Sequence, residues 1–260
     1  MPGLRQGITP NFAFLERGVV RGLSFVLFFG VGLFVLAGCG GGSSAPSMRP
    51  PRTAKLQWLG HQSFLLTSSL GTKILTNPYA PGSVPHSFPP NIRPDVLLIS
   101  NEVRTANNDG AVENFPTVFR SSVGKGINNA AGTRIRGTPT YPNPSSPDSV
   151  RMNLVFSWIT DGMKFCFLGD IPSSLPPDEA ALIGQVDVLF LPVGGRLGAA
   201  DRDVLLGQLR PRLIIPMGSR GAVEAWAAGF GRVHRPGTGY VLLNREALPA
   251  EYVGIVLSPP

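Results

Sequence analysis

The amino-acid sequence predicts an α/β domain, and three observations lead to this prediction. Short apolar runs rich in Val, Ile, Leu and Phe recur along the chain, and most are bounded by Gly, Pro, Asn or Asp, which is typical of β-strands. Such runs pair as hairpins early in the chain and alternate with short helical segments later, which indicates sheets flanked by helices. The chain contains 32 Gly and 26 Pro among 260 residues, which predicts many turns and few long helices.

The expected strands follow this pattern in order. Three of them contain continuously apolar runs, Val96–Ile99, Val188–Leu191 and Leu213–Ile215, which is expected of strands covered on both faces. The full set of expected strands is Lys55–Leu59, Gln62–Thr67, Lys73–Thr76, Val96–Ser100, Asn153–Ile159, Lys164–Leu168, Val188–Leu191, Leu213–Pro216 and Tyr252–Leu257.

Turns and helices complete the expected domain. Asp161-Gly162 lies between two strand-like runs, which is a strong signal for a two-residue hairpin. Residues 101–147 are poor in periodicity, and we expect irregular loops there around strands at Val118–Arg120 and Arg134–Arg136. The expected helices are short, namely Pro177–Ile183, Asp201–Leu209 and Arg220–Ala228.

Residues 1–38 have the features of a secretory signal peptide. Basic residues precede an apolar run of 16 residues, which as a helix would rise about 24 Å and fall short of a membrane core of about 30 Å. The four residues Leu36-Ala-Gly-Cys39 resemble the lipobox of bacterial lipoproteins. This resemblance implies cleavage before Cys39 and lipid attachment there; an uncleaved signal anchor is the alternative.

A tether follows the expected lipid attachment site. Residues 39–53 are rich first in Gly and Ser and then in Pro, and they would span at most about 50 Å. We therefore expect the folded domain at residues 54–260, outside the cytoplasm and held at a membrane of the bacterial cell envelope. After cleavage the chain carries 20 bases and 15 acids, a net charge of +5. No basic block is interleaved with aromatic residues, so we expect no nucleic-acid partner.

The domain resembles a known family at several segments. Trp58–Leu66 followed by Lys73–Pro78 is similar to the opening hairpin of metallo-β-lactamase-fold hydrolases, within the branch of ascorbate-6-phosphate-lactonase-like proteins. The similarity continues through Asp95–Ser100, Phe167–Asp170, Asp187–Gly195 and Pro211–Met217. This resemblance implies a four-layered αββα sandwich with a zinc site at one edge, where imidazole and carboxylate ligands activate a water molecule.

The sequence departs from this family at the metal ligands. Only Asp170, at the position that bridges two metals in the family, retains a ligand side chain. The position that follows Arg136–Tyr141 is Pro142, and the position that follows Ile215–Met217 is Gly218. The family's His-x-His-x-Asp-His positions fall on Asn101, Val103, Thr105 and Ala106. Val and Ala offer no lone pair, and Asn and Thr are poor zinc ligands, so we expect no cofactor.

Several residues nevertheless form a candidate cleft. Asp170 is either a remnant ligand or a turn residue whose carboxylate accepts backbone N–H groups. His61 matches a His of the family pattern and either faces a substrate or makes a hydrogen bond across its loop. We expect Cys166 to be a buried free thiol within a strand. The candidate cleft residues are His61, Asn101, Asp170, Gly194, Gly195 and Gly218.

Two functions remain open on the sequence alone. The first is a membrane-tethered, non-catalytic relative of the hydrolases that binds a small molecule or an envelope protein. The second is a metal-dependent hydrolase of small phosphate esters or lactones, which would hold zinc in an atypical site. Neither His86 nor His234 lies at a position of the family's zinc ligands, and this favours the first function.

Overall fold

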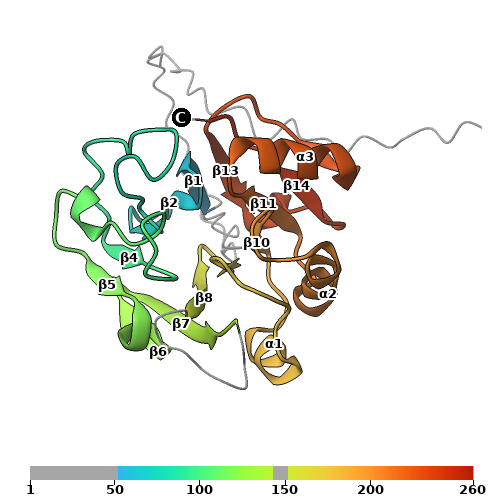
Figure 1. Ribbon diagram of the computed structural model, residues 1–260, viewed down its shortest axis with the longest axis horizontal. Helices are drawn as coiled ribbons and strands as arrows, with labels where there is room; N and C mark the ends of the chain where they lie inside the picture. Colours follow the sequence, from blue (N-terminus) through green and yellow to red (C-terminus); the bar gives the residue numbers. More distant parts are fainter. Residues whose placement is uncertain (1–51, 143–151, 260) are drawn as a thin grey trace, which may run out of the picture.

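The computed structural model describes residues 52–142 and 152–259 (Figure 1). The predicted signal peptide, Cys39 and all but the end of the predicted tether lie outside the described residues. Among the described residues, no helix is long and apolar enough to cross a membrane.

Two β-sheets form the centre of the domain. The first sheet has six strands in the order β13-β1-β2-β3-β4-β5, and the second has eight in the order β12-β14-β11-β10-β9-β8-β7-β6. The strands of the first sheet are β1 (Thr53–Gly60), β2 (Ser63–Thr67), β3 (Lys73–Thr76), β4 (Val96–Leu98), β5 (Thr117–Phe119) and β13 (Tyr240–Asn244). Those of the second are β6 (Gly126–Ala130), β7 (Thr133–Thr140), β8 (Asn153–Thr160), β9 (Met163–Phe167), β10 (Val188–Pro192), β11 (Leu213–Met217), β12 (Val233–His234) and β14 (Val253–Ile255).

Antiparallel pairs predominate up to β9, although β3, β4 and β5 are parallel to one another, and parallel pairs predominate afterwards. β1, β2 and β3 pair antiparallel, whereas β9, β10, β11 and β14 are parallel to one another. β8 and β9 are joined by Asp161-Gly162, whose φ values of 51° and 74° suit the hairpin turn that the sequence predicts. This hairpin is therefore confirmed, as is the change from antiparallel pairing to strands alternating with helices.

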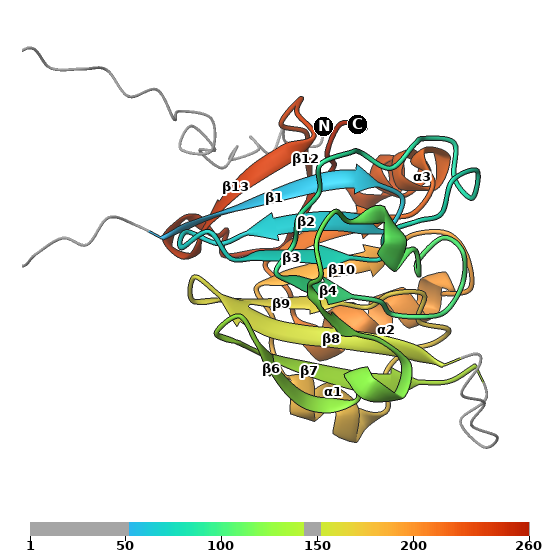
Figure 2. The same ribbon diagram turned by 90° about the vertical axis from the view of Figure 1, so that its left-hand side faces the viewer.

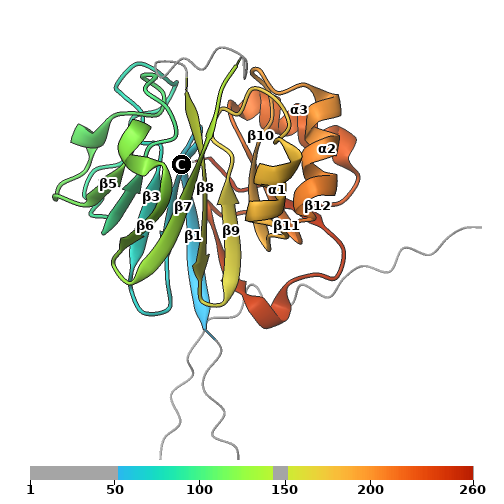
Figure 3. The same ribbon diagram turned by 90° about the horizontal axis from the view of Figure 1, so that it is seen from below.

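The main core lies between the two sheets and beneath the helices. Aromatic side chains bridge the sheets, with ring centroids 5.0 Å apart for Phe64 of β2 and Phe190 of β10. The helices α1 (Pro177–Ile183), α2 (Ala199–Leu209) and α3 (Arg220–Phe230) all cover the outer face of the eight-stranded sheet, as Figure 3 shows. Cys166 is a free thiol buried in β9, as expected, and burial raises its pKa to about 12.

The outer face of the six-stranded sheet is covered differently. Here Leu59, Leu75, Leu97 and Ile99 pack against side chains from long loops, namely Phe88, Ile92 and Val112. The α/β fold class is confirmed, but within the described part of the chain loops replace the helical layer that an αββα sandwich would place on this face. The physical reason is composition, because residues 77–95 carry six Pro and cannot continue a helix.

Most expected elements are present, and three strands were missed. β3 and α1 have the predicted bounds. β6, β12 and β13 were not predicted, because β6 contains Gly and two Asn residues, β12 has two residues, and β13 follows a Gly-rich turn. β13 pairs with β1 and closes the edge of the first sheet.

The strands begin and end at two opposite edges of the sandwich, and this arrangement positions the candidate site. Figure 2 shows β1 crossing the sandwich from Thr53 at one edge to Gly60 at the other. The parallel strands β10 and β11 end at the same edge as β1, since the Gly218 N–H donates to the His61 carbonyl at 3.3 Å. The loops that follow these strands therefore meet around one point.

Candidate functional site

A cavity of about 300 Å³ lies where these loops converge. It is bordered by the loops that follow β1, β4, β9, β10 and β11. The structure brings all six candidate cleft residues together around it, although they are spread over 158 positions of sequence: His61, Asn101, Asp170, Gly194, Gly195 and Gly218. Gln62, Val103 and Thr105 also line this cavity.

Asp170 faces the cavity from the loop after β9. Its backbone N–H donates to Asn153 Oδ1 at 2.9 Å, and its carboxylate lies 3.7 Å from Arg196 Nε. Among the described residues no backbone N–H donates to this carboxylate. The interpretation of Asp170 as an acceptor that caps its own turn is therefore wrong, and the carboxylate remains available to a ligand.

His61 has an unusual backbone and an unpartnered side chain. Its φ is 49°, and its carbonyl accepts hydrogen bonds from Trp58 Nε1 and from the Gly218 N–H. The buried Nδ1 atom has no hydrogen-bond partner in the described part of the chain, so the hydrogen bond that the sequence suggested across the loop is not made there by the side chain. Burial lowers the pKa of His61 below its ordinary value of 6.5 although Asp170 acts in the opposite direction, so the imidazole is neutral at pH 7.

His86 lies closer to this site than the sequence indicated. A Cβ atom on Gly60 would be 2.9 Å from His86 Cδ2, and the charge of His86 lowers the pKa of its neighbour His61. His86 does not line the cavity, however. It contacts the chain behind the site because the loop after β3 folds back over the end of β1.

Glycine is required at two positions of the cavity wall. Gly194 has a φ of 98°, and a Cβ there would be 2.8 Å from Ala222 Cβ of α3. Gly218 has a φ of 143°, and a Cβ there would be 3.0 Å from the Val193 carbonyl oxygen. These two glycines allow the loops to approach closely.

A network of buried amide side chains lies beneath the cavity, and the sequence reasoning missed it. Asn77 Nδ2 donates to Gln62 Oε1 at 3.0 Å and to Ser100 Oγ at 2.9 Å, while its Oδ1 accepts from the Ser100 N–H at 2.8 Å. Asn101 Nδ2 donates to the same Ser100 hydroxyl, and Asn153 holds the Asp170 backbone. The signal was the position of Asn77 and Asn101 just after apolar runs and of Asn153 just before one, and it was interpreted only as turn composition.

The residues present do not fit a zinc ion. Of the expected ligand positions, Asn101, Val103, Thr105 and Gly218 line the cavity, whereas Ala106 is buried away from it and Pro142 is exposed. The cavity offers one carboxylate and one imidazole, and zinc sites use at least three such ligands. Within residues 52–142 and 152–259, no three His, Cys, Asp or Glu side chains are placed to hold a metal ion.

The fold and this cavity define a class of protein. The domain has two packed sheets, helices over the parallel strands, and a cavity at the carboxyl ends of β9, β10 and β11. This is the architecture of metallo-β-lactamase-like domains, as the resemblance implied. Residues 55–218 match the family model described as the beta-lactamase superfamily domain, and the chain therefore belongs to this superfamily.

Individual relatives agree with this assignment. The chain is 28% identical over 179 residues to a UPF0173 protein of Pyrococcus abyssi, an alignment that covers 63% of this chain and 82% of the relative. A candidate Zn-dependent hydrolase of this superfamily from Thermotoga maritima has a solved structure with a TM-score of 0.63 and 26% identity, covering 80% of this chain and all of that one. A candidate metal-dependent hydrolase from Parabacteroides distasonis shares the fold, with a TM-score of 0.55, 17% identity, and coverage of 80% of this chain and 94% of that one.

Proposed function

We propose that this chain is a non-catalytic member of the superfamily that binds a small polar ligand in the cavity beside Asp170. The observation that carries the proposal is the composition of the cavity wall. Val103, Thr105 and Gly218 occupy positions where the resembled family places metal ligands, while the cavity and its supporting network are intact. A retained cavity without a zinc ligand set supports binding rather than zinc-dependent hydrolysis.

The size and polar groups of the cavity restrict the size and chemistry of the ligand. At about 300 Å³ the cavity lies at the small end of ligand sites and suits a metabolite-sized molecule. The Asp170 carboxylate is an acceptor, and the neutral His61 imidazole lines the same cavity. The Asn101 amide also lines it and donates to Ser100 Oγ of the network below. A ligand with hydroxyl or amine donors would satisfy the Asp170 carboxylate.

The binding function can be tested with a ligand screen by thermal shift on the purified chain. A hydroxylated or amine-bearing small molecule that raises the melting temperature of the native chain should fail to do so for Asp170→Asn. The matched control is Asp178→Asn, which removes the same charge from the exposed start of α1. Equal stabilisation of both variants would place the ligand elsewhere and contradict the proposal.

A second function, hydrolysis of small phosphate esters or lactones, is favoured by one observation. His61 is a neutral base at pH 7, and it shares the cavity with the Asp170 carboxylate. A neutral imidazole beside a carboxylate can act as a general base toward water. Measurable turnover of a p-nitrophenyl phosphate or of a lactone by the native chain, lost in His61→Asn, would establish this second function and overturn the first.

The location proposed for the protein is the bacterial cell envelope. The lipobox-like residues before Cys39 and the tether of residues 40–53 support a lipid anchor at Cys39. Labelling of growing cells with a palmitate analogue should mark the native chain and leave Cys39→Ala unlabelled. Cys166→Ala is the matched control, because its buried thiol is not available to acylation and this variant should remain labelled.

A further inference from the structure

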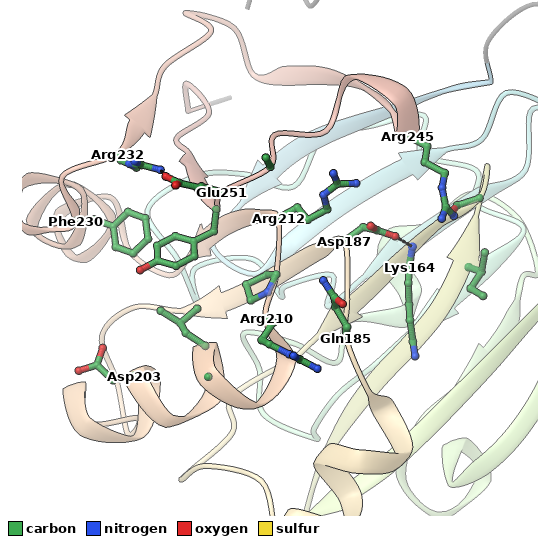
Figure 4. Close-up of a pocket in the computed structure, with 17 residues that line it drawn as sticks. Lys164, Gln185, Asp187, Asp203, Arg210, Arg212, Phe230, Arg232, Arg245 and Glu251 are labelled. Carbon is green, nitrogen blue, oxygen red and sulfur yellow. Dashed lines mark hydrogen bonds and ion pairs between the residues drawn. The ribbon is translucent and has the colours of Figure 1, made fainter. Parts of the chain in front are cut away.

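A large groove lies at the edge opposite the candidate site. It has a volume of about 1520 Å³ and is bordered by the starts of the parallel strands β9, β11 and β14 and by the end of α2. Its basic side chains are Lys164, Arg210, Arg212, Arg232 and Arg245, and Figure 4 shows them arranged around the opening. Three acids line the same groove, namely Asp187, Asp203 and Glu251.

Two of the three acids of this groove interact with neighbouring groups of the protein. Glu251 forms an ion pair with Arg232, and Asp187 accepts a hydrogen bond from the Lys164 backbone N–H at 2.8 Å. Arg210 is exposed and has no acidic partner among the described residues. The open groove therefore presents more positive than negative charge to solvent.

A smaller groove extends this basic surface. Its volume is about 220 Å³, and it shares Ile159 and Lys164 with the larger groove. It adds Arg134 and Arg136 of β7, which also lack an acidic partner in the described part of the chain, and it adds no acid. Together the two grooves carry seven bases and three acids, so most of the +5 charge of the expected mature chain gathers here.

This basic surface lies where the tether would enter the domain. Thr53, the first residue of β1, pairs with Asn244, and the next residue is Arg245 of the large groove. The β2–β3 turn borders the same edge, since the Ser69 N–H donates to Asp161 beside the groove at 2.7 Å. Leu70 in that turn is 84% exposed. The entry point of the chain, an apolar tip and the basic grooves thus share one edge.

We propose that this basic edge is a membrane-facing surface that binds the phosphate groups of anionic phospholipids. The proposal rests on the lipid anchor at Cys39 proposed above. A tether of 14 residues holds Thr53 within about 50 Å of the membrane, and the charged surface acts within a Debye length of about 8 Å once the domain approaches. Arginine side chains suit phosphate oxygens because their planar guanidinium groups donate in pairs. The cavity beside Asp170 would then face away from the membrane, toward its ligand.

The test uses the full lipidated chain reconstituted into vesicles. Because Cys39 is expected to be acylated and Cys166 is buried, one engineered cysteine can carry a fluorophore without competition. Leu70→Cys places the label on the basic edge and Val103→Cys places it at the cavity. Vesicles contain 30% phosphatidylglycerol in phosphatidylcholine, or phosphatidylcholine alone, each with a nitroxide-bearing lipid that quenches nearby fluorophores.

We expect quenching at position 70 to exceed that at position 103 at least threefold in the anionic vesicles. The difference should fall to below 1.5-fold in 0.5 M NaCl and in the triple variant Arg134→Gln, Arg210→Gln, Arg212→Gln, since both changes weaken attraction to phosphate. The matched control replaces Arg104, Arg202 and Arg220 by Gln, which removes the same charge from the cavity edge and should retain the difference.

Three results would overturn the proposal. The first is equal quenching at the two positions in anionic vesicles, and the second is an equal loss in both triple variants. The third is loss of quenching on addition of soluble glycerol 3-phosphate at constant ionic strength, which would make the groove a site for a free phosphate ester. A chain that fails to float with phosphatidylcholine vesicles contradicts the lipid anchor alone. In that case the quenching pattern in anionic vesicles still tests the basic edge.

Discussion

The two edges of the sandwich differ in the burial and hydrogen bonding of their polar side chains. At the cavity edge, Asn77, Ser100 and Asn153 are buried and hydrogen-bonded, and they hold the loops around a small cavity. At the opposite edge, Arg210 and Arg134 are exposed, have no acidic partner among the described residues, and border the two open grooves. Buried polar networks fix geometry because a lost hydrogen bond is costly there, whereas exposed charges act over distance and are screened by salt. The cavity edge is therefore built for a specific small ligand and the basic edge for a charged surface.

The largest effect on stability is expected at Gly169, which lies between the buried hydrogen-bond network and Asp170. Its φ is 62°, and a Cβ there would lie 2.6 Å from Ser100 Cβ and would also clash with Asn153. We expect Gly169→Ala to lower the free energy of unfolding by about 3–5 kcal/mol, because backbone strain adds to overpacking. Urea denaturation measures this change.

The matched control for this variant is Gly132→Ala in the β6–β7 turn. Gly132 has a similar φ of 73° with nothing within 4 Å of the added Cβ. Its substitution should cost about 1–2 kcal/mol from backbone strain alone. Equal losses in the two variants would show that the network does not pack as tightly as described.

The next largest effect is expected at Asn77. Asn77→Ala removes three hydrogen bonds and leaves Gln62 and Ser100 with buried groups unsatisfied. The free energy of unfolding should fall by about 2–4 kcal/mol. Asn107→Ala, which removes a single hydrogen bond to the Glu102 carbonyl in a partly exposed loop, should cost about 1 kcal/mol or less. A smaller loss at Asn77 than at Asn107 would contradict the role given to the network.

The stability of the domain should depend on pH through His61. Since burial lowers the pKa of His61 in the folded chain, the unfolded chain takes up a proton first as the pH falls through about 6.5. The free energy of unfolding should therefore decrease from pH 7 toward the lowered folded value and level off below it. His61→Asn, which tolerates the positive φ, should reduce this slope. An unchanged slope in this variant would show that His61 is not the group responsible.

The smallest effect on stability is expected at the basic edge. Arg210→Gln should change the free energy of unfolding by no more than about 0.5 kcal/mol, because the side chain is exposed and forms no ion pair within residues 52–142 and 152–259. Thermal unfolding of this variant measures the change. A loss comparable to that of Asn77→Ala would mean that the basic edge also maintains the fold.

Much of the fold could be predicted from the sequence because local patterns determine it. Continuously apolar runs identified β10 and β11, and Asp161-Gly162 identified the β8–β9 hairpin. β13 was missed because its role depends on pairing with β1, nearly 190 residues earlier in the chain, which no local pattern records. The loop layer over the six-stranded sheet was missed for another reason, because the family resemblance implied helices there although residues 77–95 carry six Pro.

The candidate site could be predicted only in part. The family resemblance identified Asp170, Gly194 and Gly218, and the structure gathers them around one cavity. The roles of Asn77 and Asn153 were not predictable, since an Asn at a strand end is equally typical of a turn. The basic edge was missed because Arg134, Lys164 and Arg245 converge only in the folded chain.

The central claim is that this chain retains the superfamily fold without the ligands for zinc. Elemental analysis of the purified chain, after loading with zinc and removal of free metal by desalting, tests this claim most directly. The cavity beside Asp170 and His61 predicts well below one zinc ion per chain, unchanged in Asp170→Asn. One or more zinc ions per chain, lost in Asp170→Asn, would contradict the account and place a metal centre in the cavity.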